Sequence, residues 1–219
     1  MKGIYIAAGH PTRRDALDAA RSVADAGFDF LEIGIPYNDP VADGPVIASA
    51  LDTAVKNGIT PGDVFDDMDS LFDIGIPVYV MTYSNIILQA GPAKITGRLG
   101  GKVKGFIIAD LPNRMESFLT ERGLGIPVVP FVTPETRDED LKIVARSSAD
   151  FIYLIGLRGI TGSKADLTAP ALVRQIEMIR RVTDKKIVLG FGIRTCADAR
   201  QALSIADGFV AGTEAVKRQ

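Results

Sequence analysis

The stretch TRRDALDAARSVADAGFDFLEI, residues 12–33, joins a helix pattern directly to a short apolar run. Thr12 is a suitable helix N-cap, and Asp15 follows three residues later, as in a variant of the capping box. An apolar stripe at helical spacing begins at Leu17, and Gly27 is a typical helix stop. The apolar residues that follow, 28–33, have the length of a strand. The stretch therefore predicts a helix followed directly by a buried strand.

The same alternation of apolar runs and helix patterns continues along the whole chain. The runs are residues 4–8, 28–33, 76–82, 103–109, 126–132, 151–155, 187–190 and 208–211. Short, mostly apolar runs separated by helices are typical of parallel βαβ units, and eight units predict a closed barrel. We therefore predict an α/β fold, a (β/α)₈ TIM barrel, in a single domain over residues 1–219. A length of roughly 250 residues is typical of such barrels, so this one would be a trimmed example, and we predict that it is trimmed at both ends.

Other helix boundaries are visible in the sequence. Thr60-Pro61, Thr133-Pro134 and Thr195 resemble helix starts, because Thr is a good N-cap and Pro is favoured in the first turn. A further helix is expected after Leu167, ending near Arg181.

Composition excludes several classes of function. The net charge is −2 and there is no basic run, so we expect neither nucleic acid nor an anionic membrane as a partner. Cys196 is the only cysteine, which excludes an internal disulfide and fits a reducing compartment. His10 is the only histidine, which excludes a metal site rich in histidine. The first apolar run is too short for a signal peptide or a membrane span, and we expect a cytoplasmic protein.

Two carboxylates are candidates for acid–base chemistry. If Leu31 and Ile33 face the helices, strand alternation turns Glu32 into the barrel, where burial raises its pKa. A Glu32 that faces outward and pairs with a cation is the alternative, and position alone does not decide between them. Asp43 lies in the loop that leaves the same strand, at the barrel face where active sites are built. Taken alone, Asp43 is an ordinary turn residue before Gly44.

Glycine turns after the last two strands predict a phosphate site. Gly190-Phe191-Gly192 follows the seventh apolar run and Gly212-Thr213 follows the eighth. Loops at these two positions hold phosphate in many barrels, because glycine lets backbone N–H groups approach the anion. Gly162, in the loop after the sixth run, would join them. The alternative is that these glycines only make tight turns.

A series of motifs in one order along the chain resembles a known family. The longest is FLEIGIPYNDPVADGP, residues 30–45. The others are YIAAGHP (5–11), MTYSN (81–85), ADLP (109–112), FVTPE (131–135), Tyr153, GITG (159–162) and GFGI (190–193). Together they resemble the alpha subunit of tryptophan synthase over nearly the whole chain.

The resemblance implies an enzyme of tryptophan biosynthesis, a carbon–carbon lyase. Its reaction would be the retro-aldol cleavage of indole-3-glycerol phosphate to indole and glyceraldehyde 3-phosphate, with no metal or organic cofactor. Glu32 would be the general acid–base, and Asp43 would bind the ring N–H. The other residues implied in substrate binding are Tyr83 and Tyr153 around the indole, Thr161 beside Asp43, and Gly162, Phe191, Gly192, Gly212 and Thr213 at the phosphate. The partner would be a tryptophan synthase beta subunit, which docks near Asp39 and Pro40.

The chain departs from the family pattern near the expected phosphate. Arg194 stands where the family has a small polar residue. Glu214 stands where a small residue is usual, and its charge suits a phosphate site only if it points away. Gly156-Leu157 replaces the usual Ser-Arg pair. Two alternatives therefore stay open: another phosphate-binding barrel enzyme, or a barrel without catalysis that binds and activates a beta-type partner.

Overall fold

The computed structural model describes residues 1–155 and 167–219. Its strands are β1 (Lys2–Ala7), β2 (Phe30–Gly34), β3 (Val78–Thr82), β4 (Gly105–Ile108), β5 (Phe131–Val132), β6 (Phe151–Leu154), β7 (Lys186–Leu189) and β8 (Gly208–Ala211). Its helices are α1 (Arg13–Asp25), α2 (Pro45–Lys56), α3 (Pro61–Phe72), α4 (Ser84–Ala90), α5 (Pro92–Leu99), the 3₁₀ turn η1 (Asn113–Met115), α6 (Glu116–Thr120), α7 (Asp138–Arg146), α8 (Pro170–Arg180), α9 (Cys196–Ile205) and α10 (Thr213–Val216).

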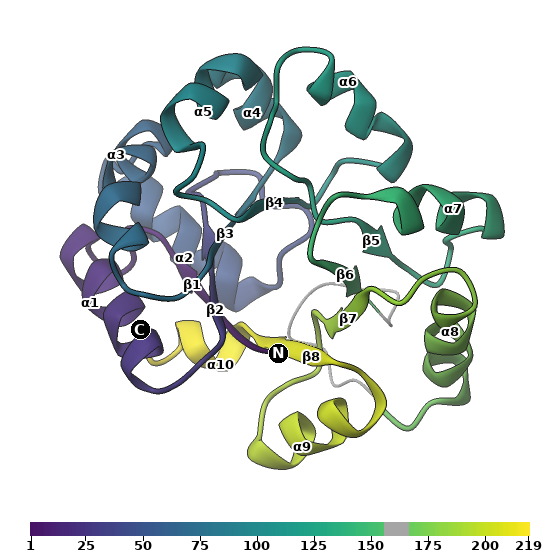
Figure 1. Cartoon of the computed structure of the whole chain (residues 1–219). Coiled ribbons are helices and arrows are strands. Elements are labelled where there is room, and N and C mark those ends of the chain that lie inside the picture. The colour runs from purple at the N-terminus through teal and green to yellow at the C-terminus, as the bar shows by residue number, and fades with distance from the viewer. Residues whose placement is uncertain (156–166) are drawn as a thin grey trace.

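The strands form one parallel sheet in the order β4-β3-β2-β1-β8-β7-β6-β5. The sheet curls so that its edge strands meet, and a parallel bridge between Phe106 and Val128 joins β4 to the segment before β5. Figure 1 shows the strands around the centre and the helices on the outside. This arrangement confirms the predicted trimmed (β/α)₈ barrel. Each of the eight expected runs carries a strand.

Several helix starts follow the sequence as predicted. The Thr12 side chain accepts a hydrogen bond from the Asp15 backbone N–H at the start of α1. Thr60 and Thr195 each form a complete capping box, with Asp63 and Asp198 respectively. The helix expected after Leu167 is α8. These caps satisfy backbone N–H groups that have no partner within the helix.

Two expectations in the middle of the chain were wrong. No helix begins at Thr133, because residues 133–136 close a turn in which the Thr136 N–H bonds the Thr133 carbonyl at 3.0 Å. α7 begins at Asp138 instead. The strand expected over residues 126–132 is reduced to Phe131–Val132. Pro127 and Pro130 have no N–H to donate, so this segment cannot sustain a regular ladder.

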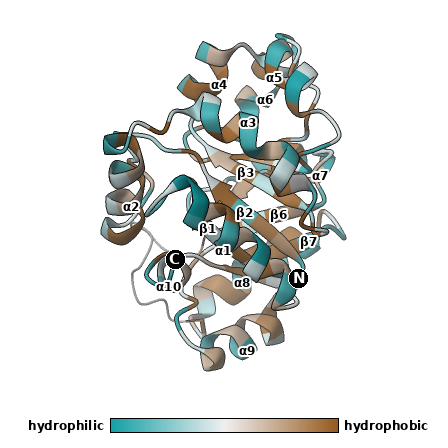
Figure 2. Ribbon diagram, turned by 90° about the vertical axis from the view of Figure 1, so that its left-hand side faces the viewer, coloured by the Kyte–Doolittle hydropathy of each residue, from teal (hydrophilic) through white to brown (hydrophobic). Residues whose placement is uncertain are grey.

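Apolar side chains pack on both faces of the sheet, and Figure 2 shows hydrophobic colour along much of its strands. Inside the barrel, Phe30, Tyr79 and Phe151 pack together with ring centroids 5.0–5.5 Å apart. Leu31 and Ile33 face the other way and join the layer under the helices. This alternation along β2 confirms that its even-numbered residues face the interior. No helix in the two described segments is long and apolar enough to cross a lipid bilayer.

Candidate active site

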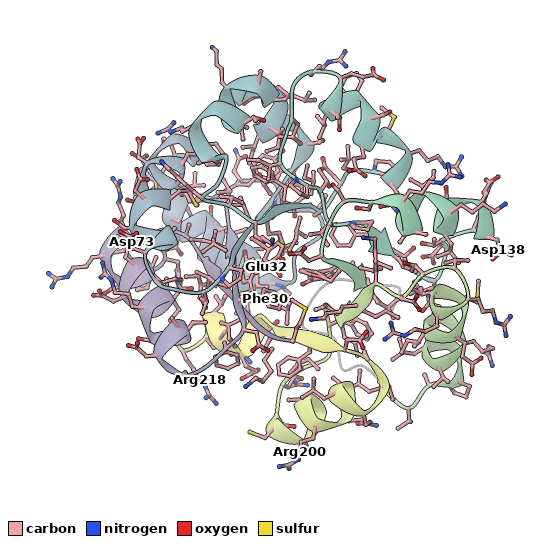
Figure 3. All side chains as sticks on the ribbon, viewed as in Figure 1. Phe30, Glu32, Asp73, Asp138, Arg200 and Arg218 are labelled. Carbon is pink, nitrogen blue, oxygen red and sulfur yellow. The ribbon has the colours of Figure 1, made fainter. Side chains whose placement is uncertain are left out.

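Strand β2 places Glu32 inside the barrel, fully buried. Its Oε2 accepts a hydrogen bond from the Tyr153 hydroxyl of β6 at 3.1 Å, while Oε1 has no hydrogen-bond partner among the described residues. Burial raises the pKa of Glu32 to about 8, the Asp43 charge adds to the rise, and the Tyr153 hydrogen bond opposes it. Figure 3 shows Glu32 and Phe30 near the centre of the ring. The outward-facing alternative is thus excluded.

Asp43 approaches the same space from the loop between β2 and α2. Its N–H bonds the Pro40 carbonyl at 2.9 Å, and Gly44 caps α2 immediately after it. The Tyr83 hydroxyl donates to Asp43 Oδ2 at 2.8 Å, and Oδ1 has no hydrogen-bond partner among the described residues. Burial raises the pKa of Asp43 to about 6, against the opposing effect of the Tyr83 hydrogen bond. Each carboxylate therefore has one oxygen that accepts a hydrogen bond from a tyrosine and one buried oxygen without a hydrogen-bond partner among the described residues.

A cavity at the carboxyl ends of the strands joins these groups to the glycine turns. Its lining includes Glu32, Asp43 and Tyr153 together with Phe191, Gly192, Gly212 and Thr213. Seven of the residues expected at the site thus line one cavity. Tyr83 does not line it, and instead stands behind Asp43. Thr161 and Gly162 lie outside the described residues, as do Gly156 and Leu157.

The cavity is also lined by residues that the sequence analysis did not single out. Tyr5 on β1 is paired in register with Glu32, and its hydroxyl occupies the space that a side chain at Gly34 would fill. The apolar wall is made by Ile47, Met81, Ala109, Phe131, Ile155, Ile193 and Val210. Strand alternation was a signal for Tyr5, because Tyr5 faces the interior like Glu32. The apolar wall is made by residues from many strands, and the order of residues in the sequence does not show which of them lie side by side.

The two ends of the cavity differ in character. One end holds the buried carboxylates and two tyrosine hydroxyls beside apolar side chains, which suits a planar aromatic group with a polar edge. The other end holds the glycine turns after β7 and β8, where a barrel typically binds phosphate. Glu214 does not line the cavity, and its Oε1 pairs with Lys217 Nζ at 2.7 Å. The fold and this cavity define the class of (β/α)₈-barrel proteins, here with a pair of buried carboxylates in the cavity at the carboxyl ends of the strands.

Comparison with known proteins identifies the family. Residues 4–219 match the sequence profile of the tryptophan synthase alpha chain. The alpha chain of Halorhodospira halophila is 35% identical over 97% of this chain and 80% of its own length, and that of Streptomyces coelicolor is 35% identical over 98% and 80%. A solved structure of Mycobacterium tuberculosis tryptophan synthase superposes with a TM-score of 0.87 at 27% identity, covering 97% of this chain and 82% of its own. The chain belongs to the tryptophan synthase alpha chain family, and is a carbon–carbon lyase of tryptophan biosynthesis.

Proposed function

We propose that Glu32 and Asp43 carry out the retro-aldol cleavage of indole-3-glycerol phosphate in the cavity described above. One observation carries this assignment: two buried carboxylates with different pKa values line one apolar cavity, each with one oxygen that has no hydrogen-bond partner among the described residues. A pair of carboxyl groups whose environments separate their pKa values is suited to divide the roles of proton donor and charge stabiliser.

Glu32 is the proton carrier in this proposal. With a pKa of about 8, it is mostly protonated at neutral pH and can deliver its proton to the indole ring carbon that bears the glycerol side chain. The carboxylate so formed accepts the proton of the adjacent side-chain hydroxyl. The carbon–carbon bond then breaks, its electron pair returns to the ring, and the side chain leaves as the aldehyde. The proton count balances, because Glu32 ends as it began.

Asp43 stabilises the charge that develops on the ring. Protonation of the ring carbon places positive charge on the indole nitrogen, and a nearby carboxylate lowers the energy of that state. A pKa of about 6 leaves Asp43 mostly ionised at neutral pH. The hydrogen bond from Tyr83 fixes Oδ2 and leaves Oδ1 to accept the ring N–H. Tyr153, which lines the cavity and holds Glu32, packs beside the indole.

The phosphate is assigned to the turns that contain Phe191, Gly192, Gly212 and Thr213, which line the far end of the cavity. We assign a beta subunit that consumes the indole as the partner. Its docking surface is the exposed part of the loop between β2 and α2. There Asp39 is exposed, Pro40 is half-buried, and the Val41 side chain is 68% exposed. This loop also carries Asp43, so a partner that contacts it is able to influence the site.

The proposal is tested by indole release from indole-3-glycerol phosphate, with and without an added tryptophan synthase beta subunit. We expect Glu32→Gln and Asp43→Asn each to lower kcat by a factor of about 10² or more, the range typical of a lost general acid–base. Glu116→Gln is the matched control, because Glu116 is another partly buried carboxyl with a raised pKa, outside this cavity. A wild-type chain inactive even with the partner would refute the lyase assignment. Full activity in Glu32→Gln would refute the role of that residue alone.

A further inference from the structure

The charges that line the cavity are few and are distributed unevenly. Three of the described lining residues are acidic or basic: Glu32, Asp43 and Arg194. Arg194 is therefore the only cation in that part of the wall. A phosphate ester carries up to two negative charges, so the carboxylates repel it and Arg194 attracts it.

The backbone at Arg194 is fixed by the start of α9. The Arg194 N–H donates to Asp198 Oδ2 at 3.0 Å, and the same oxygen accepts the Thr195 N–H at 2.8 Å. Arg194 thus directly follows the Gly190–Ile193 turn and precedes a capped helix. Its side chain is exposed, and its guanidinium makes no hydrogen bond or ion pair within the described segments. The start of α9 therefore fixes the backbone of Arg194, while the N–H donors of its guanidinium have no partner among the described residues.

The neighbouring charges place the guanidinium at the phosphate end. Arg194 contributes to the lowered pKa of Asp198, on α9, and of Glu214, on α10. It does not figure among the causes of the raised pKa values of Glu32 and Asp43. Glu214 forms its ion pair with Lys217 and does not line the cavity, and no ion pair joins it to Arg194 in the described segments.

We propose that Arg194 binds the phosphate group of the substrate, and so fixes which end of the substrate enters the cavity towards Glu32. The guanidinium offers several N–H donors in one plane, which match the oxygens of a phosphomonoester. It adds a charge-assisted contact to the backbone N–H groups of the glycine turns. This inference rests on the proposed function for the position of the phosphate, and extends it to a specificity-determining side chain.

The test is direct binding of glycerol 3-phosphate, measured by calorimetry, with glycerol as the uncharged probe. We expect Arg194→Ala to weaken glycerol 3-phosphate binding about tenfold, as for the loss of one exposed charge-assisted hydrogen bond. Arg194→Lys should recover part of the affinity, and Arg194→Gln should not. The matched control is Arg200→Ala, since Arg200 lies on α9 outside the cavity and points away from the barrel (Figure 3).

Kinetics supply a second readout. Arg194→Ala should raise KM for indole-3-glycerol phosphate about tenfold while changing kcat much less, because phosphate binding is made in the ground state as well as in the transition state. Added salt should weaken binding to wild type more than to Arg194→Ala. Equal affinity of wild type and Arg194→Ala for glycerol 3-phosphate would overturn the inference while leaving the carboxylate roles intact. Intact phosphate binding with no indole release would instead refute the proposed function.

Discussion

At the scale of single residues, the proposed acid–base role of Glu32 depends on a buried position where ionisation of its carboxyl group is costly. Its pKa is raised from 4.5 to about 8. Because the folded value is the higher one, the native state holds the proton more tightly than the unfolded chain does. The stability due to this proton is complete below about pH 4.5 and is lost as the pH rises through 8. Ionisation of Glu32 therefore lowers the stability of the folded chain.

Replacing Glu32 with Gln should stabilise the protein at alkaline pH. The amide cannot ionise, and its oxygen can still accept the Tyr153 hydrogen bond. Relative to wild type, we expect the free energy of unfolding to be roughly 3–5 kcal/mol higher at pH 9, with little difference near pH 4.5. Chemical denaturation at three or four pH values measures this difference. A gain that does not depend on pH would show that ionisation of Glu32 is not its source.

The hydrogen bond from Tyr83 to Asp43 should set the acid limb of the pH–rate profile. This bond stabilises the ionised carboxylate and lowers its pKa, so its removal raises a pKa that is already about 6. In Tyr83→Phe we expect the acid limb of kcat/KM to move to higher pH by up to about one unit. The control is Tyr37→Phe: the Tyr37 ring packs on Tyr83 at 4.8 Å, but its hydroxyl bonds Asn85. If the acid limb does not shift in Tyr83→Phe, that limb reports the titration of a group other than Asp43.

The sequence was informative about the polar residues of the site and less so about its walls. Glu32 is an acidic residue near the end of a mostly apolar run, which made it a candidate, whereas Asp43 became one only because its loop leaves the same strand. Tyr5 and Phe131 look like ordinary core residues in a linear pattern. Their place in the cavity depends on how strands from opposite sides of the barrel align, and no local signal records that alignment.

At the scale of secondary-structure elements, glycines at the ends of strands make room for the tyrosines of the site. A side chain at Gly190, after β7, would place its Cβ 1.7 Å from Tyr153 Cε1. A side chain at Gly34, in β2, would lie 1.9 Å from the Tyr5 hydroxyl. These separations are far inside contact distance, so the strand ends and the tyrosine rings are fitted to each other.

Gly190→Ala should therefore displace Tyr153 and, with it, the hydrogen bond that fixes Glu32. We expect a loss of about 1–3 kcal/mol in stability, as for other overpacked sites, and at least a tenfold loss in kcat. Gly97→Ala is the control, because Gly97 lies in α5 and an added Cβ there meets nothing within 4 Å. That variant should gain about 0.5–1 kcal/mol from helix propensity. Thermal melts measure the stability of both variants, and the indole assay measures their kcat. Wild-type stability and kcat in Gly190→Ala would contradict the close packing of Gly190 against Tyr153.

The elements that were predicted correctly are those with their own local signals. α1, α3 and α9 each begin at a Thr whose cap is satisfied by an Asp three residues on. The errors fall between β4 and α7, where local signals conflict with the backbone. Thr133-Pro134 resembles a helix start, but the Thr133 hydroxyl accepts the Glu135 N–H at 3.3 Å and a turn results. The shortness of β5 follows from the two prolines that interrupt its apolar run.

At the scale of the whole molecule, segments distant in sequence complete one sheet. β1 pairs with β2 on one side and with β8 on the other. Near the end of the chain, the Gln219 side chain donates to the Ala7 and His10 carbonyls and accepts the Ala7 N–H, at 2.7–3.0 Å. The candidate site also joins distant segments, since Glu32 on β2 accepts a hydrogen bond from Tyr153 on β6. Strands from both the first and the second half of the described chain are therefore needed to form the site.

This interdependence predicts that residues 1–219 unfold as one domain. We expect a single thermal transition with the same midpoint by far-ultraviolet and tyrosine near-ultraviolet circular dichroism, and equal calorimetric and van't Hoff enthalpies. Gln219→Ala should lower both midpoints together, by about 2–4 °C, because it removes the hydrogen bonds that link the residue near the end of the chain to Ala7 in β1 and to His10. Arg218→Ala is the control, since Arg218 is an exposed neighbour on the surface (Figure 3). Two separate transitions, or a shift confined to one probe, would mean that the halves of the barrel are stable independently and that the cavity forms only when they associate.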